Sequence, residues 1–444
     1  TPVSGEVNTY VLFTELAADI SSDPGWASLV VKSGIAIDKT PAPVFHGLLD
    51  SGRVRSIVDV VNAGGTFPAI ATQTRFSICT LGGSRRETTF AASMLNLGLD
   101  EAAEKDPIYL TSEEVWVGCP LTGTLLSAPS KDQYQLAIDL HRRLPILDID
   151  GENPWQITYA TLFHSSGDSG LFLRKEDLEA DGWVLGRDKV FRHPDGREAL
   201  PLLEGQLVNM FDHRARTYQG YTGNKRYGQH PGVLTPTDEE KASVEFEAEP
   251  RYWVDAATSH NRLVDKIGER AIVAVRNVTD AITNSRSARA ALVPRVPVAD
   301  SLSILAAPRD VVLELLGVIN SSSFDFLARS HLPGTNLARV WILSQIVVPP
   351  PGLDPRVSEL AERLSVTSKL LADEYGFALH RWDPAQRERD LVELDALVAK
   401  TGYGLSRDEY ELILDSFNLL HRIQEKEHGE YRFKRLCLEA YDRI

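Results

Sequence analysis

Arginine, lysine and asparagine alternate with tyrosine and tryptophan in the middle of the chain, a combination that suits contact with nucleic acid. The stretches are HRARTYQGYTGNKRYGQHPG, EPRYWVD and AVRNVTDAITNSRSARAALVPR. Cationic and amide side chains can bind phosphates or base edges, and aromatic rings can stack on bases or wedge between them. The candidate DNA-contacting residues are Arg214, Arg216, Lys225, Arg226, Arg276, Arg286, Arg289 and Arg295. The alternative interpretation is a set of solvated loops with ordinary charges.

The net charge of −15 argues at first against a nucleic-acid partner, but the charge is unevenly distributed. Residues 251–350 contain eleven Lys or Arg against eight Asp or Glu, a local balance of +3. Residues 353–444 contain fourteen against nineteen, a local balance of −5. A locally basic region can neutralise phosphates whatever the total charge, although random scatter would also produce such counts.

Searches for other chemistry find little. No Walker-type glycine loop, GxSxG or HExxH motif occurs, and Gly64-Gly65 lacks the third glycine of a dinucleotide fingerprint. Asp212 and His213 could form a general base, but a surface ion pair or a core histidine is the commoner arrangement. The chain has three widely separated cysteines, Cys79, Cys119 and Cys437. This spacing favours a reducing, cytoplasmic compartment and argues against a structural zinc or any other metal site.

The chain alternates between helix and strand up to about residue 90. Helices are predicted over VNTYVLFTELAADI and PAPVFHGLLDSG, and strands over WASLVVKSG, VRSIVDVV and RFSICTL. The last two strands are expected to be antiparallel, in a three-layer α/β arrangement. Because these strands are too few for a complete doubly wound domain, we expect the missing half before Thr1, in which case the sequence is a fragment, a processed product or an incomplete record.

Three further regions follow. Residues 91–150 form a connector with one helix, KDQYQLAIDLHRRL. Residues 151–352 have the irregular pattern of an α+β domain, with a capped helix over SSSFDFLARS and a final strand over ARVWILSQIVVPPP. Residues 353–444 are helical, and Ser406 with Glu409 fits a capping box. No apolar run is long enough to span a bilayer, so the chain is not expected in a membrane.

The loop before RFSICTL is unexpectedly apolar. A hairpin linker should be polar, yet Phe67 and Pro68 follow Gly64-Gly65 here. The glycines allow a sharp turn and the proline stiffens the segment after it. The Phe67 ring would then project from the rim of the sheet toward a substrate, or alternatively cover the hydrophobic layer between sheet and helix.

The order of these blocks resembles the second half of the amino-group DNA adenine methyltransferase catalytic domain, in particular that of the large type IIG restriction–modification and phage-defence methyltransferases. The matching blocks are VNTYVLF, VVNAGGTFPAIATQTRFSICTL, NPWQITYATLFHSSGDSGLF, LPLLEGQLVNMFDHRARTYQG, EPRYWV, SFDFLARSHLPGTNLARVWILSQIVVPPP, ELDALVAKTGYGLSRDEYELILDSF and GEYRFKRLCLEAYDRI. They cover essentially the whole chain. The resemblance implies an α/β fold: the C-terminal part of a Rossmann-like methyltransferase sheet in residues 1–90, a connector in 91–150, a DNA target-recognition domain in 151–352 and a helical C-terminal region in 353–444.

Enzymes of this family flip the target adenine out of the duplex and methylate its amino group from S-adenosylmethionine. By resemblance, Phe67 lies against the flipped base and Pro68 follows it. Asn8, Tyr10 and Phe13 correspond to the block near the cofactor, where Phe13 would line the adenine pocket. The alternative for Phe13 is a core helix residue.

Two family motifs that normally precede the Asn8 block are absent: the Gly-rich cofactor loop and the catalytic Asn/Asp-Pro-Pro-Tyr/Phe/Trp tetrapeptide. Asn153-Pro154-Trp155 does not replace the tetrapeptide, because it has one proline and lies far downstream. We therefore predict no catalytic residue in this chain and no methylation by it alone. The intact protein would be an adenine-specific DNA methyltransferase of restriction–modification or phage defence. The alternative is a non-catalytic DNA-specificity subunit, or one half of a split methyltransferase that works with an N-terminal half or other defence-system subunits.

Overall fold

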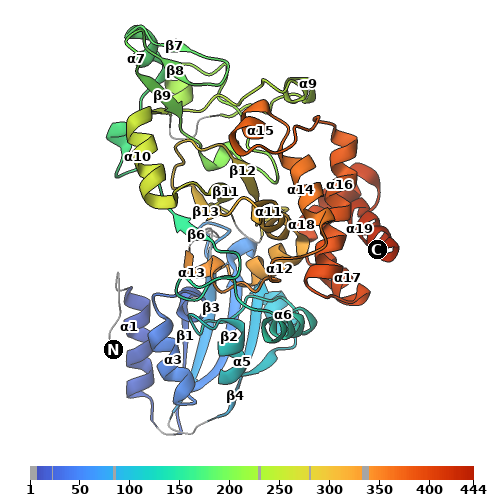
Figure 1. Ribbon diagram of the computed structural model, residues 1–444. Helices are drawn as coiled ribbons and strands as arrows, with labels where there is room; N and C mark the ends of the chain where they lie inside the picture. Colours follow the sequence, from blue (N-terminus) through green and yellow to red (C-terminus); the bar gives the residue numbers. More distant parts are fainter. Residues whose placement is uncertain (1–7, 23, 84–86, 229–231, 280–281, 333–339) are drawn as a thin grey trace.

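The computed structural model describes residues 8–22, 24–83, 87–228, 232–279, 282–332 and 340–444. Figure 1 shows an N-terminal α/β part at the bottom, a strand-rich middle part above it and a group of C-terminal helices on the right. Three segments of the stretches quoted above, residues 229–231, 280–281 and 333–339, lie outside the described residues.

The N-terminal part is built on a five-stranded mixed sheet with the strand order β1-β3-β2-β4-β5. Its strands are β1 (Trp26–Lys32), β2 (Val54–Val61), β3 (Arg75–Gly82), β4 (Thr89–Asn96) and β5 (Ile108–Thr111). β3 is antiparallel to both of its neighbours, and Leu29 of β1 and Ile57 of β2 both pair with Cys79. The predicted antiparallel pairing of β2 and β3 is confirmed. β4 runs parallel to β2, and both β4 and β5 lie in or next to the stretch that the sequence suggested was a connector.

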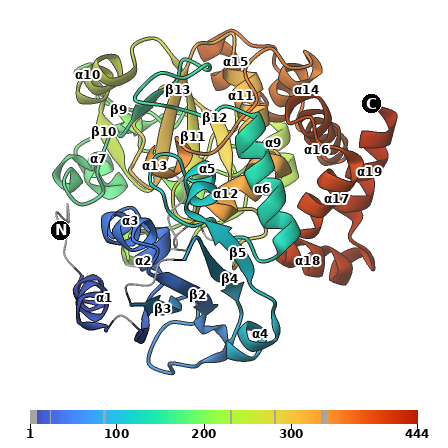
Figure 2. The same ribbon diagram turned by 90° about the horizontal axis from the view of Figure 1, so that it is seen from below.

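Six helices accompany this sheet: α1 (Thr9–Ile20), α2 (Gly34–Ile37), α3 (Ala42–Asp50), α4 (Leu99–Glu104), α5 (Ser112–Gly118) and α6 (Lys131–Arg143). The helices predicted at α1, α3 and α6 are confirmed. Pro41 precedes α3, where its missing N–H costs the helix no hydrogen bond. Ser130 caps α6 by accepting from the Gln133 N–H. α1 lies at the outer edge of the N-terminal part, far from the C-terminal helices, in both views (Figures 1 and 2).

Strand β1 differs from its prediction. Its apolar sequence is typical of a buried strand, yet Trp26 is 72% and Val30 is 59% exposed. In the described part of the chain β1 is hydrogen-bonded to β3 alone, so it is an edge strand of the sheet. Burial of a strand on both faces requires covering layers, which an apolar sequence does not guarantee.

The middle part contains two four-stranded sheets, ordered β10-β9-β8-β7 and β12-β11-β13-β6. The strands are β6 (Thr158–Ala160), β7 (Val184–Leu185), β8 (Phe191–Arg192), β9 (Glu198–Pro201), β10 (Trp253–Asp255), β11 (Ala271–Arg276), β12 (Ala290–Val293) and β13 (Leu302–Ala307). The helices are α7 (Lys175–Ala180), α8 (Asn224–Tyr227), α9 (Asp238–Ala242), α10 (Ala256–Ile267), α11 (Val312–Asn320), α12 (Ser322–Ser330) and α13 (Val340–Leu343). The predicted cap of α12 is confirmed, because the Ser321 hydroxyl accepts from the Phe324 N–H.

The strand predicted over ARVWILSQIVVPPP is wrong in its described part. Residues 340–343 form helix α13, and Val347 makes only an isolated bridge with Ile146. The Ile346 carbonyl accepts from the Leu147 N–H and the Val348 N–H donates to the Pro145 carbonyl. The apolar run therefore forms a buried extended segment beside another short segment, and the prolines at 349–351 have no N–H to continue a ladder.

The C-terminal region is helical as predicted, with α14 (Arg356–Ser365), α15 (Lys369–Tyr375), α16 (Pro384–Leu397), α17 (Arg407–Asp415), α18 (Asn418–His428) and α19 (Arg432–Arg443). The capping box of Ser406 and Glu409 is confirmed at α17. One hydrophobic core connects this region to the N-terminal sheet, since Ile57, Phe324 and Leu397 belong to the same buried cluster. Among the described residues, no helix combines the length and apolar character needed to cross a bilayer.

Candidate functional site

The loop that joins β2 to β3, residues 62–74, is anchored by a buried asparagine. Asn62 is 1% exposed, and its amide nitrogen donates to the carbonyls of Phe67 (3.0 Å) and Ile70 (2.9 Å). Its Oδ1 accepts from the Phe67 N–H at 2.9 Å. Gly65 has a φ of 69°, a left-handed conformation that favours glycine. Asn62 thus fastens the Phe67 backbone to the end of strand β2.

The Phe67 ring lies at the surface of this loop. It is 36% exposed, and its edge packs against buried Phe76 with a centroid separation of 5.0 Å and an interplanar angle of 83°. Pro68 is exposed beside it. The backbone of Phe67 is therefore fixed, while part of its ring is open to solvent. This placement is compatible with both sequence interpretations, and contact with a flipped base remains a prediction.

A buried ion pair that the sequence analysis missed lies below the loop. Arg75 Nη2 and Asp59 Oδ2 are 2.6 Å apart, with side chains 8% and 0% exposed. Asp59 also accepts from the Ser33 hydroxyl (2.5 Å) and the Leu95 N–H (2.9 Å). The available signal was an aspartate inside the apolar run VRSIVDVV, since a buried carboxylate requires a partner.

Arg75 also connects this end of the sheet to the rest of the molecule. Its Nη1 donates to the Leu332 carbonyl at 3.0 Å, two residues after the end of α12, and its Nη2 donates to the Ser127 hydroxyl at 2.9 Å. The end of the sheet that carries Phe67 therefore faces α12, between the N-terminal and middle parts (Figure 1).

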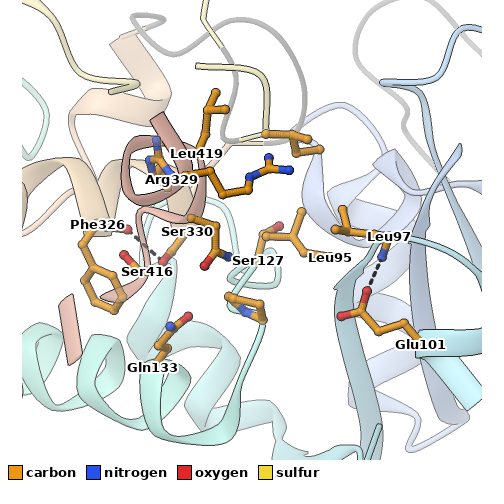
Figure 3. Close-up of a pocket in the computed structure, with 14 residues that line it drawn as sticks. Leu95, Leu97, Glu101, Ser127, Gln133, Phe326, Arg329, Ser330, Ser416 and Leu419 are labelled. Carbon is orange, nitrogen blue, oxygen red and sulfur yellow. Dashed lines mark hydrogen bonds between the residues drawn. The ribbon is translucent and has the colours of Figure 1, made fainter. Parts of the chain in front are cut away.

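A cavity of about 180 Å³ lies next to this end of the sheet. Figure 3 shows Leu95 and Leu97 on one side of it and Phe326, Arg329 and Ser330 on the other. The Leu97 N–H donates to Glu101 Oε2 at 2.7 Å. A Cβ placed on Gly64 would lie 3.9 Å from the Leu97 carbonyl oxygen, so the Phe67 loop and the cavity wall are neighbours.

Arg329, a charged side chain at the inner wall of the cavity, is already hydrogen-bonded within the protein. Arg329 Nη2 donates to the carbonyls of Asn284 (2.8 Å) and Ser285 (3.1 Å). These bonds hold the segment that follows β11 against α12, and Ile282 of that segment also lines the cavity. The cavity thus marks where the N-terminal, middle and C-terminal parts meet, and among the described residues its polar groups do not form a nucleophile–base pair.

Three of the predicted DNA-contacting arginines are buried inside the protein. Arg214, Arg226 and Arg286 are 0%, 0% and 7% exposed. Arg214 donates to the Thr367 hydroxyl (2.8 Å), and Arg226 pairs with Glu249 (2.7 Å). The prediction of direct DNA contact is corrected for these three residues, because their guanidinium groups are sheltered from solvent and bonded within the fold.

Arg286 lies beside two buried carboxylates. Its Nε lies 2.8 Å from Asp325 Oδ2, its Nη2 donates to the Asn320 carbonyl at 2.7 Å, and Asp395 lies 3.8 Å from its Nη1. The two carboxylates raise the pKa of Arg286 although burial acts in the opposite direction. This arginine therefore stabilises the packing of α12 against α16.

The other five predicted DNA-contacting residues are nearer the surface. Arg216 and Lys225 are exposed, and Arg276, Arg289 and Arg295 are half-buried. Arg289 donates to Asn284 Oδ1 at 2.6 Å, and Arg295 donates to the Arg270 carbonyl at 2.6 Å. DNA contact by these five residues remains a prediction.

The residues assigned to the cofactor lie on or just before α1. Asn8 is exposed, Tyr10 is half-buried and Phe13 is 62% exposed. Burial and the nearby Asp38 carboxylate raise the pKa of Tyr10. A free Phe13 ring could stack on an adenine, but the described residues do not enclose Phe13 or Asn8. A complete S-adenosylmethionine site would need further residues, so no chemical step is derived from it.

The adjacent Asp212 and His213 form two separate buried contacts. Asp212 pairs with Lys241 at 2.5 Å, and His213 Nε2 lies 3.0 Å from Glu247 Oε2. Attraction by Lys241 lowers the pKa of Asp212 despite its burial. Asp212 thus forms a core ion pair of the middle part, and His213 forms a core hydrogen bond. The three cysteines are all buried, and the described residues contain no group of three potential ligands arranged for a metal ion.

No protein-family model and no curated protein sequence matches the chain. Among solved structures, one similar to it is that of the type IIL restriction–modification enzyme MmeI in complex with DNA, with 8% identity, a TM-score of 0.44 and 92% of this chain covered. Another is the type IIG restriction endonuclease BpuSI, with 13% identity, a TM-score of 0.32 and 99% of this chain covered. The chain spans about half the length of each, 51% and 50%. At these low values the matches assign no activity to the chain.

Proposed function

We propose that the chain is the DNA-recognition and partial catalytic portion of an S-adenosylmethionine-dependent, adenine-specific DNA methyltransferase of restriction–modification or phage defence. The observation that carries this proposal is the Phe67 loop. Buried Asn62 holds the loop backbone at the rim of a mixed sheet by donating to the Phe67 and Ile70 carbonyls and accepting from the Phe67 N–H, and the Phe67 side chain is 36% exposed.

Phe67 would bind the target base after the base has left the duplex. Stacking on an aromatic ring offsets part of the cost of unstacking from DNA, which is a few kcal/mol. In a flexible loop, the entropy cost of ordering the loop on binding would cancel this stacking free energy. Asn62 avoids that cost because it fixes the Phe67 backbone before DNA binds. S-adenosylmethionine would supply the transferred methyl group. Its binding site would need residues in addition to Asn8, Tyr10 and Phe13.

The test begins by selecting a preferred sequence from a pool of randomised duplexes with the chain as it exists. Each adenine of the selected sequence is then replaced by 2-aminopurine, whose fluorescence rises when it leaves the stack. We expect one adenine position to give a strong increase on binding. Phe67→Ala should abolish most of that increase while changing DNA affinity little, because phosphate contacts supply most of the affinity.

Ile70→Ala is the matched control, since Ile70 is 46% exposed and belongs to the same loop. It should keep the fluorescence increase, because its side chain lacks a base-stacking surface. Equal signals from the unchanged chain, Phe67→Ala and Ile70→Ala would contradict the role of Phe67. Failure to bind any duplex would contradict the function as a whole.

A second function is favoured by the apolar surface around the free edge of β1. Leu12, Phe13, Leu16, Ile20, Trp26 and Val30 are each 49% or more exposed on α1 and β1. Exposed apolar side chains on two adjoining elements are a feature of interaction sites. In this alternative the chain is a specificity subunit or one half of a split methyltransferase, and a separate α/β partner covers the edge.

Methylation assays separate the two functions. The chain with labelled S-adenosylmethionine and the selected duplex should transfer no methyl group. Adding a separately produced protein half that carries a Gly-rich loop and an Asn-Pro-Pro-Tyr-like tetrapeptide should restore transfer if the split arrangement is correct. Methylation by the chain alone would refute the view that its catalytic groups lie elsewhere.

A further inference from the structure

The end of strand β11 carries a guanidinium that has no partner among the residues that the structure describes. Arg276 is the last residue of β11, and its backbone N–H donates to the Arg289 carbonyl at 2.9 Å. Its side chain is half-buried, yet it makes no hydrogen bond or ion pair with any described residue. Three residues further along, the Thr279 hydroxyl is 2% exposed and likewise lacks a partner among the described residues. Buried polar groups are usually bonded, so this strand end is an exception that needs an explanation.

A second arginine, Arg216, belongs to a segment that attaches beside the end of β11. The Phe211 N–H donates to the Ala290 carbonyl at 2.8 Å. The segment that leads to Arg216 is therefore bonded to Ala290, and the end of β11 is bonded to the preceding residue, Arg289. Arg216 is exposed, and it donates to the Thr235 hydroxyl. Burial and the neighbouring positive charge of Arg216 lower the pKa of Arg276. Neither guanidinium has a carboxylate partner in the described part of the chain.

Two of the three buried arginines of the same region have the carboxylates that this pair lacks. Arg226 has Glu249, and Arg286 has Asp325 and Asp395, as counter-ions. Two neighbouring guanidinium groups without a carboxylate repel each other and create a local positive field. An anion between them would remove that repulsion, and the planar guanidinium fork matches phosphate oxygens in geometry.

We propose that Arg216 and Arg276 together bind one phosphate group of the duplex, an inference that rests on the DNA-binding function proposed above. Arg216 would reach the phosphate from the surface, and Arg276 would hold it from the end of β11. Because a phosphate carries no base identity, this contact would position the DNA without selecting its sequence.

The test measures the affinity of the full chain for a duplex of about 30 base pairs between 50 and 200 mM KCl, where each phosphate contact contributes about 0.9 to the slope of log affinity against log salt concentration. The variants are Arg216→Gln, Arg276→Gln and the double variant. Arg270→Gln is the matched control, because Arg270 is exposed at the opposite end of β11. Thermal melting of each variant checks the fold, and exposed Arg216 provides a variant that leaves the core intact.

We expect each single variant to reduce the slope by about 1 and to weaken binding equally for all sequences. The double variant should lose little more than either single variant, because both side chains hold the same phosphate. Arg270→Gln should retain the original slope. An unchanged slope in Arg216→Gln and Arg276→Gln would overturn this inference and leave the proposed function intact. An unchanged chain that binds no duplex would overturn both, and competition by free inorganic phosphate alone would identify an ion site unrelated to DNA.

Discussion

The Phe67 loop and the arginine-rich middle part reverse the usual relation between residue type and surface. In the loop, an apolar ring is partly exposed while a polar amide, Asn62, is buried beneath it. In the middle part, Arg214, Arg226 and Arg286 are buried although arginine is normally a surface residue. In both regions the buried polar groups form most of their bonds inside the fold, with the backbone, a hydroxyl or carboxylates. Burial follows from available partners, and a side chain without them, such as that of Arg276, becomes the candidate for an external ligand.

The strongest test of this contrast is Arg286→Ala. The substitution removes the cation beside Asp395 and the nearer of the two cations beside Asp325, which keeps only Arg329 at 3.6 Å. This should reduce the free energy of unfolding by about 3–5 kcal/mol. Chemical denaturation monitored by tryptophan fluorescence measures the loss. Arg270→Ala is the control, since exposed Arg270 should change stability by less than about 0.5 kcal/mol. Loss of DNA affinity by a stably folded Arg286→Ala protein would instead restore the original prediction that this residue contacts DNA.

Asn62→Ala tests the other region. The substitution removes three hydrogen bonds and leaves the Phe67 N–H and the Phe67 and Ile70 carbonyls to find new partners, at a cost of about 1–3 kcal/mol. Hydrogen exchange should increase within residues 62–74 and remain unchanged in β11. The conservative Asn62→Asp variant keeps the acceptor for the Phe67 N–H and should be intermediate. Equal exchange in all three proteins would show that the loop is held by other contacts.

Local patterns predicted much of this fold, because helices and hairpin strands are decided by neighbouring residues. Pro41 and the Ser406–Glu409 box each marked a helix end that the structure contains. Long-range partners were not predictable in the same way. Whether Arg286 is buried depends on Asp325 and Asp395, which lie 39 and 109 residues beyond it in the sequence. Likewise, the strand predicted at residues 346–348 had only a short partner segment to pair with.

Buried basic groups without a carboxylate partner should behave differently from Arg286. His331 is buried, its Nε2 lies 3.2 Å from His141 Nε2, and its Nδ1 lies 3.4 Å from Cys119 Sγ. Burial lowers the pKa of both histidines, while burial raises that of the Cys119 thiol to about 12, so the thiol does not titrate below neutral pH.

Stability should therefore fall as the pH decreases below about 6.5, the pKa of an unfolded histidine. In that range the unfolded chain binds protons that the folded chain excludes, so each such histidine weakens folding by up to about 1.4 kcal/mol per pH unit. Denaturation at pH 7.5, 6.5 and 5.5 measures the effect, and His141→Gln should reduce the dependence. A constant free energy of unfolding over this range would mean that the two imidazoles accept protons within the fold.

Phe67→Ala should have the smallest effect on stability. The ring packs edge-on against Phe76 and keeps 36% of its surface exposed, so its removal should cost about 1 kcal/mol. A phenylalanine that completed the hydrophobic layer would cost about 3–5 kcal/mol. Phe76→Ala provides that comparison in the same protein, because Phe76 is 8% exposed. Equal destabilisation by the two substitutions would place Phe67 in the core. A clear difference in destabilisation, together with loss of the 2-aminopurine signal in Phe67→Ala alone, would show that Phe67 serves to stack on a base and that Phe76 serves to pack the core.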